Sequence, residues 1–231
     1  MQAYTLDSVA FGYPGRPVFR DLSLTIHRSG VTALVGNNGS GKSTLLSLLA
    51  GIEKPHAGRV RAHLPDRPAL VVQQSAAAAA FPVTVRGAVS MGRWGRAGLV
   101  RPLSRSDRRT VERAMDRMDI RSLAAHPLGE LSGGQRQRAL VAQGLAQEAR
   151  ILLLDEPDAG LDQYARELIT EALRAEAARG VTVVQATHDL VRARAAEHCL
   201  LLAGGQASEH GNPRNVSAGN GIQFERSPDF P

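Results

Sequence analysis

The segment Gly36–Thr44, which reads GNNGSGKST, constrains the fold of this chain more than any other feature. It matches the pattern G-x-x-x-x-G-K-[ST], which needs a strand before it and a helix after it. The preceding run Val31–Val35 is apolar and rich in β-branched residues, as expected of a strand buried on both faces. Glycines let the backbone curl so that its N–H groups point at phosphate oxygens, and the helix start adds partial positive charge. The sequence therefore predicts a phosphate-binding loop.

The residue types inside this segment predict separate roles in binding a nucleotide. Lys42 is expected to reach the β- and γ-phosphates, and Ser43 is expected to ligate Mg²⁺. A glycine-rich turn without function is the alternative, but the complete register and the flanking elements disfavour it. The predicted nucleotide-binding residues are Gly36, Asn37, Asn38, Gly39, Ser40, Gly41, Lys42, Ser43 and Thr44.

A second segment places two carboxylates at the end of an apolar run. Ile151–Leu154 reads ILLL and predicts a buried strand, and Asp155 and Glu156 follow it directly. Ligands of open α/β sheets lie at the carboxyl ends of the strands. We expect Asp155 to hold Mg²⁺ and Glu156 to act as a general base that orients and deprotonates water. Alone this pattern is a weak signal, whereas together with the phosphate loop it is a strong one.

A third segment, Leu131–Gln135, reads LSGGQ and precedes a predicted helix. Ser132 is a candidate N-cap, and Gly133 and Gly134 expose backbone N–H groups at the helix start. An ordinary capped helix is the alternative interpretation. Because one nucleotide rarely needs two such cradles from one chain, we expect Ser132, Gly133, Gly134 and Gln135 to bind a nucleotide that another subunit holds.

The order of the remaining elements predicts an α/β fold. Further buried strands are expected at Leu70–Val72 and Val181–Val184, and an amphipathic helix is expected over Asp162–Arg179. Another helix is expected after Ser106, as its N-cap. Alternation over Tyr4–Ala10 and Leu22–His27 predicts a small antiparallel layer at the start of the chain.

The expected domain organisation is one domain over residues 1–231. Its core covers about residues 1–81 and 141–205, and a helical subdomain covers about residues 82–140. The polar stretch after Gly204 has no periodicity, and residues 206–231 are expected to form a loosely ordered tail.

Composition excludes several classes of protein. Cys199 is the single cysteine, so a disulfide framework or a cysteine-based zinc site is not expected. The chain has no run of about 18 apolar residues and no apolar core near its start, which predicts a cytosolic chain whose membrane role comes through a partner. The net charge is +6, and every basic residue except Lys42 and Lys54 is arginine. We interpret this as codon bias, while a nucleic-acid-binding ATPase stays as an alternative.

Taken in order, GNNGSGKST, LSGGQ, ILLLDEP and the later His188 resemble the ATP-binding subunit of ABC transporters over about residues 1–205. This resemblance implies a P-loop NTPase core with a mostly parallel sheet, an N-terminal antiparallel layer and an inserted helical subdomain. It also implies that the chain hydrolyses ATP with Mg²⁺ as cofactor.

The resemblance assigns roles to four further residues. Gln73 matches the glutamine that senses the γ-phosphate and the metal, and His188 matches the histidine that steadies the attacking water. Tyr13 matches the aromatic residue on which adenine stacks, whereas Phe11 is expected in the core. Asp162 matches the loop that communicates between two nucleotide sites. The sequence departs from the family pattern at Asp158, where threonine or an aromatic residue is usual.

The resemblance also implies partners and a cargo. Two copies would face each other head to tail, and integral-membrane permease subunits would dock on residues 73–94 from the cytoplasmic face of the membrane. An extracytoplasmic solute-binding protein would act indirectly, and no nucleic acid is expected. The strings Phe81–Val85, Met91–Gly95 and Gly144–Ala149 resemble zinc and manganese importers, with siderophore or cobalamin importers as the alternative.

Overall fold

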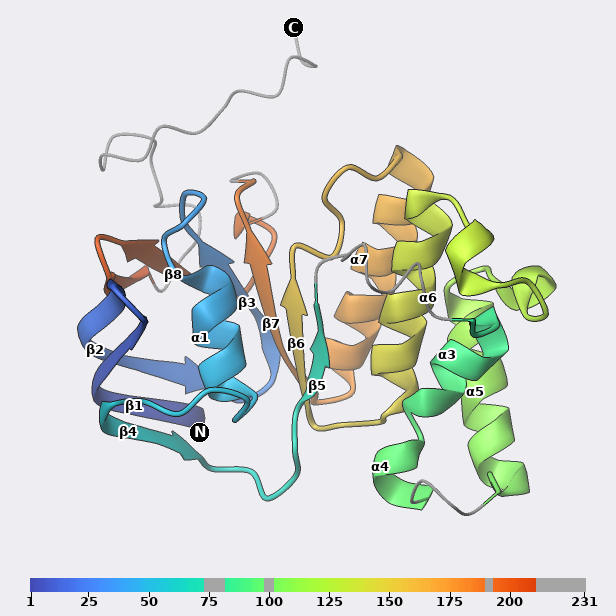
Figure 1. The fold of residues 1–231 in the computed structure, drawn as a ribbon, viewed down its shortest axis with the longest axis horizontal. Helices are drawn as coiled ribbons and strands as arrows, with labels where there is room; N and C mark the ends of the chain where they lie inside the picture. Colours follow the sequence, from blue (N-terminus) through green and yellow to red (C-terminus); the bar gives the residue numbers. More distant parts are fainter. Residues whose placement is uncertain (73–81, 98–101, 190–192, 211–231) are drawn as a thin grey trace, which may run out of the picture. The chain divides into compact units, whose positions relative to one another are not determined.

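The computed structural model describes residues 1–72, 82–97, 102–189 and 193–210 (Figure 1). The chain divides into two compact units, which we call unit 1 and unit 2. Unit 1 comprises Met1–Pro65 with Val184–Pro231, and unit 2 comprises Asp66–Val183.

Unit 1 contains the predicted antiparallel layer. Strands β1 (Gln2–Tyr13) and β2 (Arg16–His27) form a hairpin, and β4 (Ala57–Ala62) pairs with the other edge of β1. The alternation of the sequence arises because one face is covered; its buried side chains include Tyr4, Leu6, Val9, Phe19, Leu22 and Ile26. The prediction of this layer is confirmed, although β4 was not expected, because its side chains are nearly all exposed and carry no apolar pattern.

The parallel strands of unit 1 carry the phosphate loop. Strand β3 (Gly30–Val35) pairs in parallel with β8 (His198–Ala203), and the loop joins β3 to helix α1 (Lys42–Leu49). Strand β9 (Gln206–His210) pairs antiparallel with β8. The expectation of a loosely ordered tail from residue 206 was therefore wrong for these five residues. Backbone pairing with β8 orders them, and such pairing leaves no periodic signal in a polar sequence.

Unit 2 contains a second parallel pair and the helix that follows it. Strand β5 (Ala69–Val71) pairs in parallel with β6 (Ile151–Asp155), and α7 (Gln163–Ala178) comes after β6. Strand β7 (Thr182–Thr187) runs across the boundary between the units. Both the β6 strand and the α7 helix lie where the sequence predicted them.

The remaining part of unit 2 is helical among its described residues. Helix α6 packs against α3, α5 and β5 (Figure 1). The elements in chain order are α3 (Val85–Met91), α4 (Trp94–Ala97), α5 (Arg105–Arg117), the 3₁₀ turns η1 (Arg121–Leu123) and η2 (Leu128–Glu130), and α6 (Gly133–Ala146). The described residues of this part also form one isolated β-bridge, between Thr84 and Pro127. The bounds of the helical subdomain, about residues 82–140, stay a prediction.

The start of α5 differs from the prediction. The N-cap is Ser104 rather than Ser106, because Ser104 has an acidic residue three positions later. The Ser104 hydroxyl accepts a hydrogen bond from the Asp107 amide, and the Asp107 carboxylate accepts one from the Ser104 amide. With Ser106 as the cap, the reciprocal acceptor would have to be Arg109, which has none.

A buried arginine ties the helices of unit 2 together. The Arg93 guanidinium bonds the Asp107 carboxylate at 2.9 Å, the Glu148 carboxylate at 3.0 Å and the Ala146 carbonyl at 2.8 Å. Hydrogen bonds from Ser104 and then from Arg93 lower the pKa of Asp107. These contacts join the end of α3, the start of α5 and the end of α6. Among the described helices, none is long and apolar enough to span a bilayer.

Candidate functional site

The phosphate loop of unit 1 adopts a backbone that requires glycine at two positions. Gly39 has φ of 81° and Gly41 has φ of 102°, both in the left-handed region that side chains with a Cβ avoid. Gly41 is the N-cap residue of α1, so the helix begins at Lys42 with its first N–H groups at the end of the loop. The predicted strand–loop–helix arrangement is confirmed.

Close packing holds the loop between two strands of unit 1. A Cβ added at Gly36 would overlap Ser40 Oγ and lie 2.6 Å from the Leu202 carbonyl oxygen of β8. A Cβ added at Gly41 would lie 2.8 Å from the Phe19 ring and 2.9 Å from a Val18 methyl group, both on β2. The first and last of these glycines therefore allow the close approach that shapes the cradle.

Lys42 lies against the inner side of the loop. Its ammonium Nζ donates hydrogen bonds to the Gly36 carbonyl at 2.8 Å and to the Asn37 carbonyl at 3.3 Å, and the residue is only 6% exposed. The next residue, Ser43, is exposed in the first turn of α1. A buried cation at the start of a helix suits an anionic phosphate chain, so this loop fits a nucleotide.

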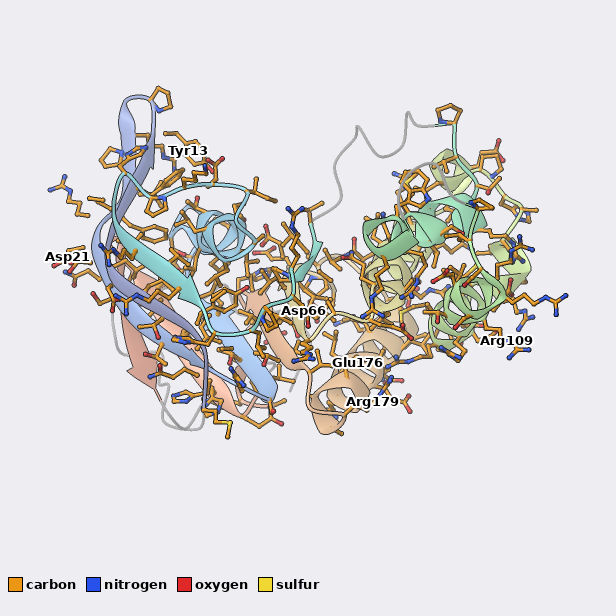
Figure 2. The ribbon with its side chains drawn as sticks, turned by 90° about the horizontal axis from the view of Figure 1, so that it is seen from below. Tyr13, Asp21, Asp66, Arg109, Glu176 and Arg179 are labelled. Atoms are coloured by element: carbon orange, nitrogen blue, oxygen red, sulfur yellow. The ribbon has the colours of Figure 1, made fainter. Side chains whose placement is uncertain are left out.

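Tyr13 lies near the tip of the β1–β2 hairpin, where Figure 2 labels it. It is 44% exposed, and its ring meets the edge of the buried Phe11 ring at a centroid distance of 5.3 Å. Phe11 in turn packs against the His56 ring at 5.2 Å. The expected division is confirmed, with Phe11 in the core and Tyr13 at the surface, while adenine stacking on Tyr13 stays a prediction.

Two further residues were expected near the phosphates. His188 lies directly after β7, is exposed and belongs to unit 1, like the loop. The Thr187 hydroxyl beside it accepts a hydrogen bond from the Asp189 amide at 3.0 Å, which shapes the turn after the strand. Gln73 lies outside the described residues, and so does the rest of the predicted docking segment up to Phe81.

Asp155 and Glu156 lie at the carboxyl end of β6 in unit 2. All five residues of β6 are buried, and Asp155 is 9% exposed. Glu156 has φ of 44°, a left-handed conformation that is strained for a glutamate and costs about 1–3 kcal/mol. The sequence did not predict this conformation, because glycine or asparagine, rather than glutamate, usually adopts a positive φ. The two carboxylates, predicted as the metal ligand and the general base, thus belong to one sharp strand-to-turn transition.

The LSGGQ segment forms the start of α6 in unit 2. The Ser132 hydroxyl accepts a hydrogen bond from the Gln135 amide at 3.3 Å, and Gln135 Oε1 accepts one from the Ser132 amide at 3.0 Å. Ser132 and Gln135 therefore make a reciprocal capping box, and Ser132 is confirmed as the N-cap. Ser132 and Gly133 are exposed, as an anion-binding helix start requires.

Asp162 is the N-cap of α7, because its Oδ1 accepts a hydrogen bond from the Ala165 amide at 2.8 Å. The sequence had assigned this residue only to communication between sites. An aspartate directly before a helical pattern is the sequence signal that would have revealed this cap. The neighbouring Asp158 is buried, at 3% exposed.

Contacts that the sequence did not predict link α6, α7 and the turn after α5 in unit 2. The Tyr164 hydroxyl of α7 donates to Asp119 Oδ2 at 2.8 Å, which raises the pKa of Tyr164. Arg138 of α6 lies over the Tyr164 ring at 5.7 Å and donates to the Met118 carbonyl at 2.9 Å. The helix that starts at LSGGQ and the helix that starts at Asp162 are therefore tied to each other near their starts.

The predicted site residues fall into two groups. Unit 1 holds the phosphate loop, Tyr13 and His188, and unit 2 holds Asp155, Glu156, Asp162 and the LSGGQ segment. Within the described residues, no group of three or more histidine, cysteine, aspartate or glutamate side chains is placed to hold a metal ion.

Comparison with known proteins identifies the family. A family model described as ABC transporter matches residues 19–159. The chain is 38% identical to the hemin import ATP-binding protein HmuV of Rhodococcus jostii, covering 91% of this chain and 75% of that protein. It is 36% identical to the manganese transport system ATP-binding protein MntA of Synechocystis, covering 86% and 80%.

A solved structure agrees with these relatives. The dimeric structure of MJ0796, a bacterial ABC transporter cassette, superposes with a TM-score of 0.78 at 26% identity. The match covers 90% of this chain and 98% of that one. Motifs, fold and relatives agree, so this chain belongs to the ABC transporter family and is one of its ATPases.

Proposed function

We propose that this chain is the ATP-hydrolysing subunit of an importer for transition-metal ions, with manganese or zinc as cargo. The phosphate loop of unit 1 carries the proposal, because its buried Lys42 and close-packed glycines fit a nucleotide. The importer role is supported by relatives named for manganese transport and hemin import. Manganese has named relatives at 36% and 31% identity, while zinc is supported only by the sequence strings.

In the proposed mechanism, the predicted site residues act on the phosphates of ATP. Lys42 and the loop amides neutralise and orient the phosphate chain. Glu156 accepts a proton from the attacking water, and His188 and Gln73 position that water and the γ-phosphate. The strained backbone of Glu156 supports a role at the reacting atoms, because strain of this kind is concentrated at functional positions.

Ser43, Asp155 and Gln73 are the proposed contacts of Mg²⁺. Ser43 presents an exposed hydroxyl one residue after Lys42, and Asp155 presents a carboxylate at a strand end. Oxygen atoms of these types fit the preference of Mg²⁺ for hard ligands, with water and phosphate oxygens as its other partners. When bound, the ion neutralises charge on the phosphate oxygens.

We propose that two copies assemble head to tail around ATP. The exposed helix start at Ser132 and Gly133 supports this assembly, since it offers backbone amides that its own phosphate loop does not need. The dimeric structure of MJ0796 supports it as well. Asp162, at the start of α7, is proposed to communicate between the two nucleotides.

The proposed membrane partners are permease subunits that dock at the cytoplasmic face, on residues 73–94. Trp94 supports this surface, because it is 40% exposed and directly follows the buried Arg93. Tryptophan is among the residue types that contribute most to binding at protein interfaces. An extracytoplasmic solute-binding protein would deliver the cargo to those partners and would not touch this chain.

A metal-chelate importer is the second candidate. The 38% identity to a hemin import protein and a further relative named for siderophore transport favour it. The two candidate importers differ only in the cargo that their membrane partners carry, which is a metal ion in one and a metal chelate in the other. The chemistry of this chain is the same in both cases.

The alternative of a nucleic-acid-binding ATPase is disfavoured by how the arginines are used. Arg93, Arg117 and Arg138 donate to backbone carbonyls and carboxylates inside unit 2. Others form ion pairs on its surface, among them Arg86 with Glu112 and Arg150 with Asp66. A nucleic-acid interface would need a concentration of basic side chains available for phosphates.

The test compares cells that lack the subunit with cells complemented by the wild-type chain or by Glu156→Gln. Loss of cell manganese or zinc, restored by the wild-type chain and not by Glu156→Gln, is expected. Unchanged manganese and zinc with lost growth on hemin or a siderophore would favour the second candidate. Unchanged uptake of all these cargoes would contradict the importer proposal.

A further inference from the structure

The β1–β2 hairpin holds two side chains opposite each other beside the phosphate loop. Tyr13 and Arg16 are paired across a two-residue turn made of Pro14 and Gly15. Gly15 has φ of 72°, and proline followed by a glycine of positive φ is the signature of a type II turn. The turn therefore fixes both residues at the tip of the hairpin.

A second close contact fixes the backbone at Arg16. A Cβ added at Gly12 would lie 2.8 Å from the Arg16 carbonyl oxygen and 2.8 Å from Pro17 Cα. Because glycine permits this approach, the two strands of the hairpin close tightly just before the turn. The position of Arg16 is thus set by a proline, a left-handed glycine and a steric contact.

The Arg16 side chain lies over the tip of the phosphate loop. Its guanidinium Nη2 is 3.5 Å from the place where a Cβ at Gly39 would stand. Two residues further along β2, Val18 and Phe19 pack on Gly41. Strand β2 therefore follows the outer side of the loop, with Arg16 at Gly39 and the apolar side chains at the helix start.

Arg16 brings a positive charge to the Gly39 side of the phosphate loop. It is exposed, and no carboxylate in the described part of the chain pairs with it. Lys42 supplies the other charge, from the Gly36 and Asn37 side of the same loop. A guanidinium has planar, forked donors that match phosphate oxygens.

We propose that Arg16 is a nucleotide-binding residue whose guanidinium donates to a phosphate oxygen of the ATP held by Gly36–Thr44. The hairpin then recognises both ends of the nucleotide, with Tyr13 beneath the adenine and Arg16 on the phosphates. This inference depends on ATP binding and not on the importer function proposed above.

The test measures the dissociation constants of ATP and adenosine for the wild-type chain, Arg16→Ala and Arg20→Ala. Arg20 is an exposed arginine of the same strand, so Arg20→Ala removes the same charge four residues from Arg16. Adenosine binding is followed by NMR titration, which measures millimolar affinities. Thermal unfolding of all three proteins shows that each is folded.

We expect Arg16→Ala to weaken ATP binding roughly threefold to tenfold, the loss typical of a partly screened ionic hydrogen bond. Adenosine binding should stay unchanged, and Arg20→Ala should match the wild type for both compounds. Wild-type affinity for ATP in Arg16→Ala would overturn the inference. An equal loss of adenosine and ATP, or an equal loss of ATP in Arg20→Ala, would overturn it too. If no folded protein bound ATP, the family's own nucleotide site would be in question instead.

Discussion

Gly144 of α6 and Val71 of β5 approach each other so closely that a Cβ added at Gly144 would lie 2.5 Å from the Val71 γ-methyl group. Gly144 lies near the end of the helix that begins at LSGGQ, and Val71 is the last residue of the strand before Gln73. This contact therefore limits how closely α6 packs on the strand that precedes Gln73, the predicted γ-phosphate sensor.

The contact predicts an unusual result for Gly144→Ala. Alanine is favoured over glycine inside a helix by about 1 kcal/mol, but the added methyl group must displace a buried, stiff valine. We expect a net destabilisation of about 1–2 kcal/mol, measured by urea unfolding. In a Val71→Ala background the same substitution should be neutral or stabilising. An equal effect of Gly144→Ala in both backgrounds would refute the steric explanation.

Tyr4 predicts a change in both stability and its pH dependence. Its hydroxyl is buried without a hydrogen-bond partner in the described part of the chain, and burial raises the pKa of Tyr4 from 10.0 to about 12. The unfolded chain loses this proton first, so the folded state loses stability as pH rises from about 10 to about 12.

Tyr4→Phe should therefore raise the free energy of unfolding at pH 7 by up to about 1 kcal/mol, since the desolvated hydroxyl is removed. It should also reduce the loss of stability above pH 10. Urea unfolding at pH 7 and at pH 10.5 measures both effects, with the exposed Tyr13→Phe as control. A less stable Tyr4→Phe protein at pH 7 would show that the hydroxyl has a stabilising partner.

Two substitutions at Asp162 separate its structural role as a helix cap from its proposed role in communication between nucleotides. Asp162→Ala removes the N-cap of α7 and should lower the free energy of unfolding by about 1 kcal/mol. Asp162→Asn keeps a capping oxygen and should match the wild-type stability while it removes the charge. If the charge communicates between two nucleotides, Asp162→Asn should lose cooperativity in ATP hydrolysis. Wild-type stability of Asp162→Ala would contradict the capping role.

The sequence was informative where a pattern depends on neighbouring residues. The phosphate loop, the buried run that became β6 and the amphipathic stripe of α7 all have short-range signals, and the structure places them as expected. The burial of Phe11 followed from its alternation with Leu6 and Val9, whereas Tyr13 was singled out by the family resemblance alone.

Features that depend on distant contacts were not predictable. The polar strands β4 and β9 exist because their backbones pair with β1 and β8, and their sequences show no apolar period. The left-handed backbone of Glu156 has no compositional signal. The contacts of Arg93 and of Tyr164 join residues far apart in the chain, as do those of Gly144, and only the fold reveals them.

In the proposed mechanism, two copies of this chain close on ATP and Glu156 then activates water. The most direct test is light scattering of Glu156→Gln with saturating ATP and Mg²⁺, with Lys42→Ala as the variant that loses the phosphate contact. We expect Glu156→Gln to become a stable dimer with trapped ATP, its hydrolysis to fall roughly 100-fold or more, and Lys42→Ala to stay monomeric. A Glu156→Gln protein that binds ATP and remains a monomer would rule out this mechanism.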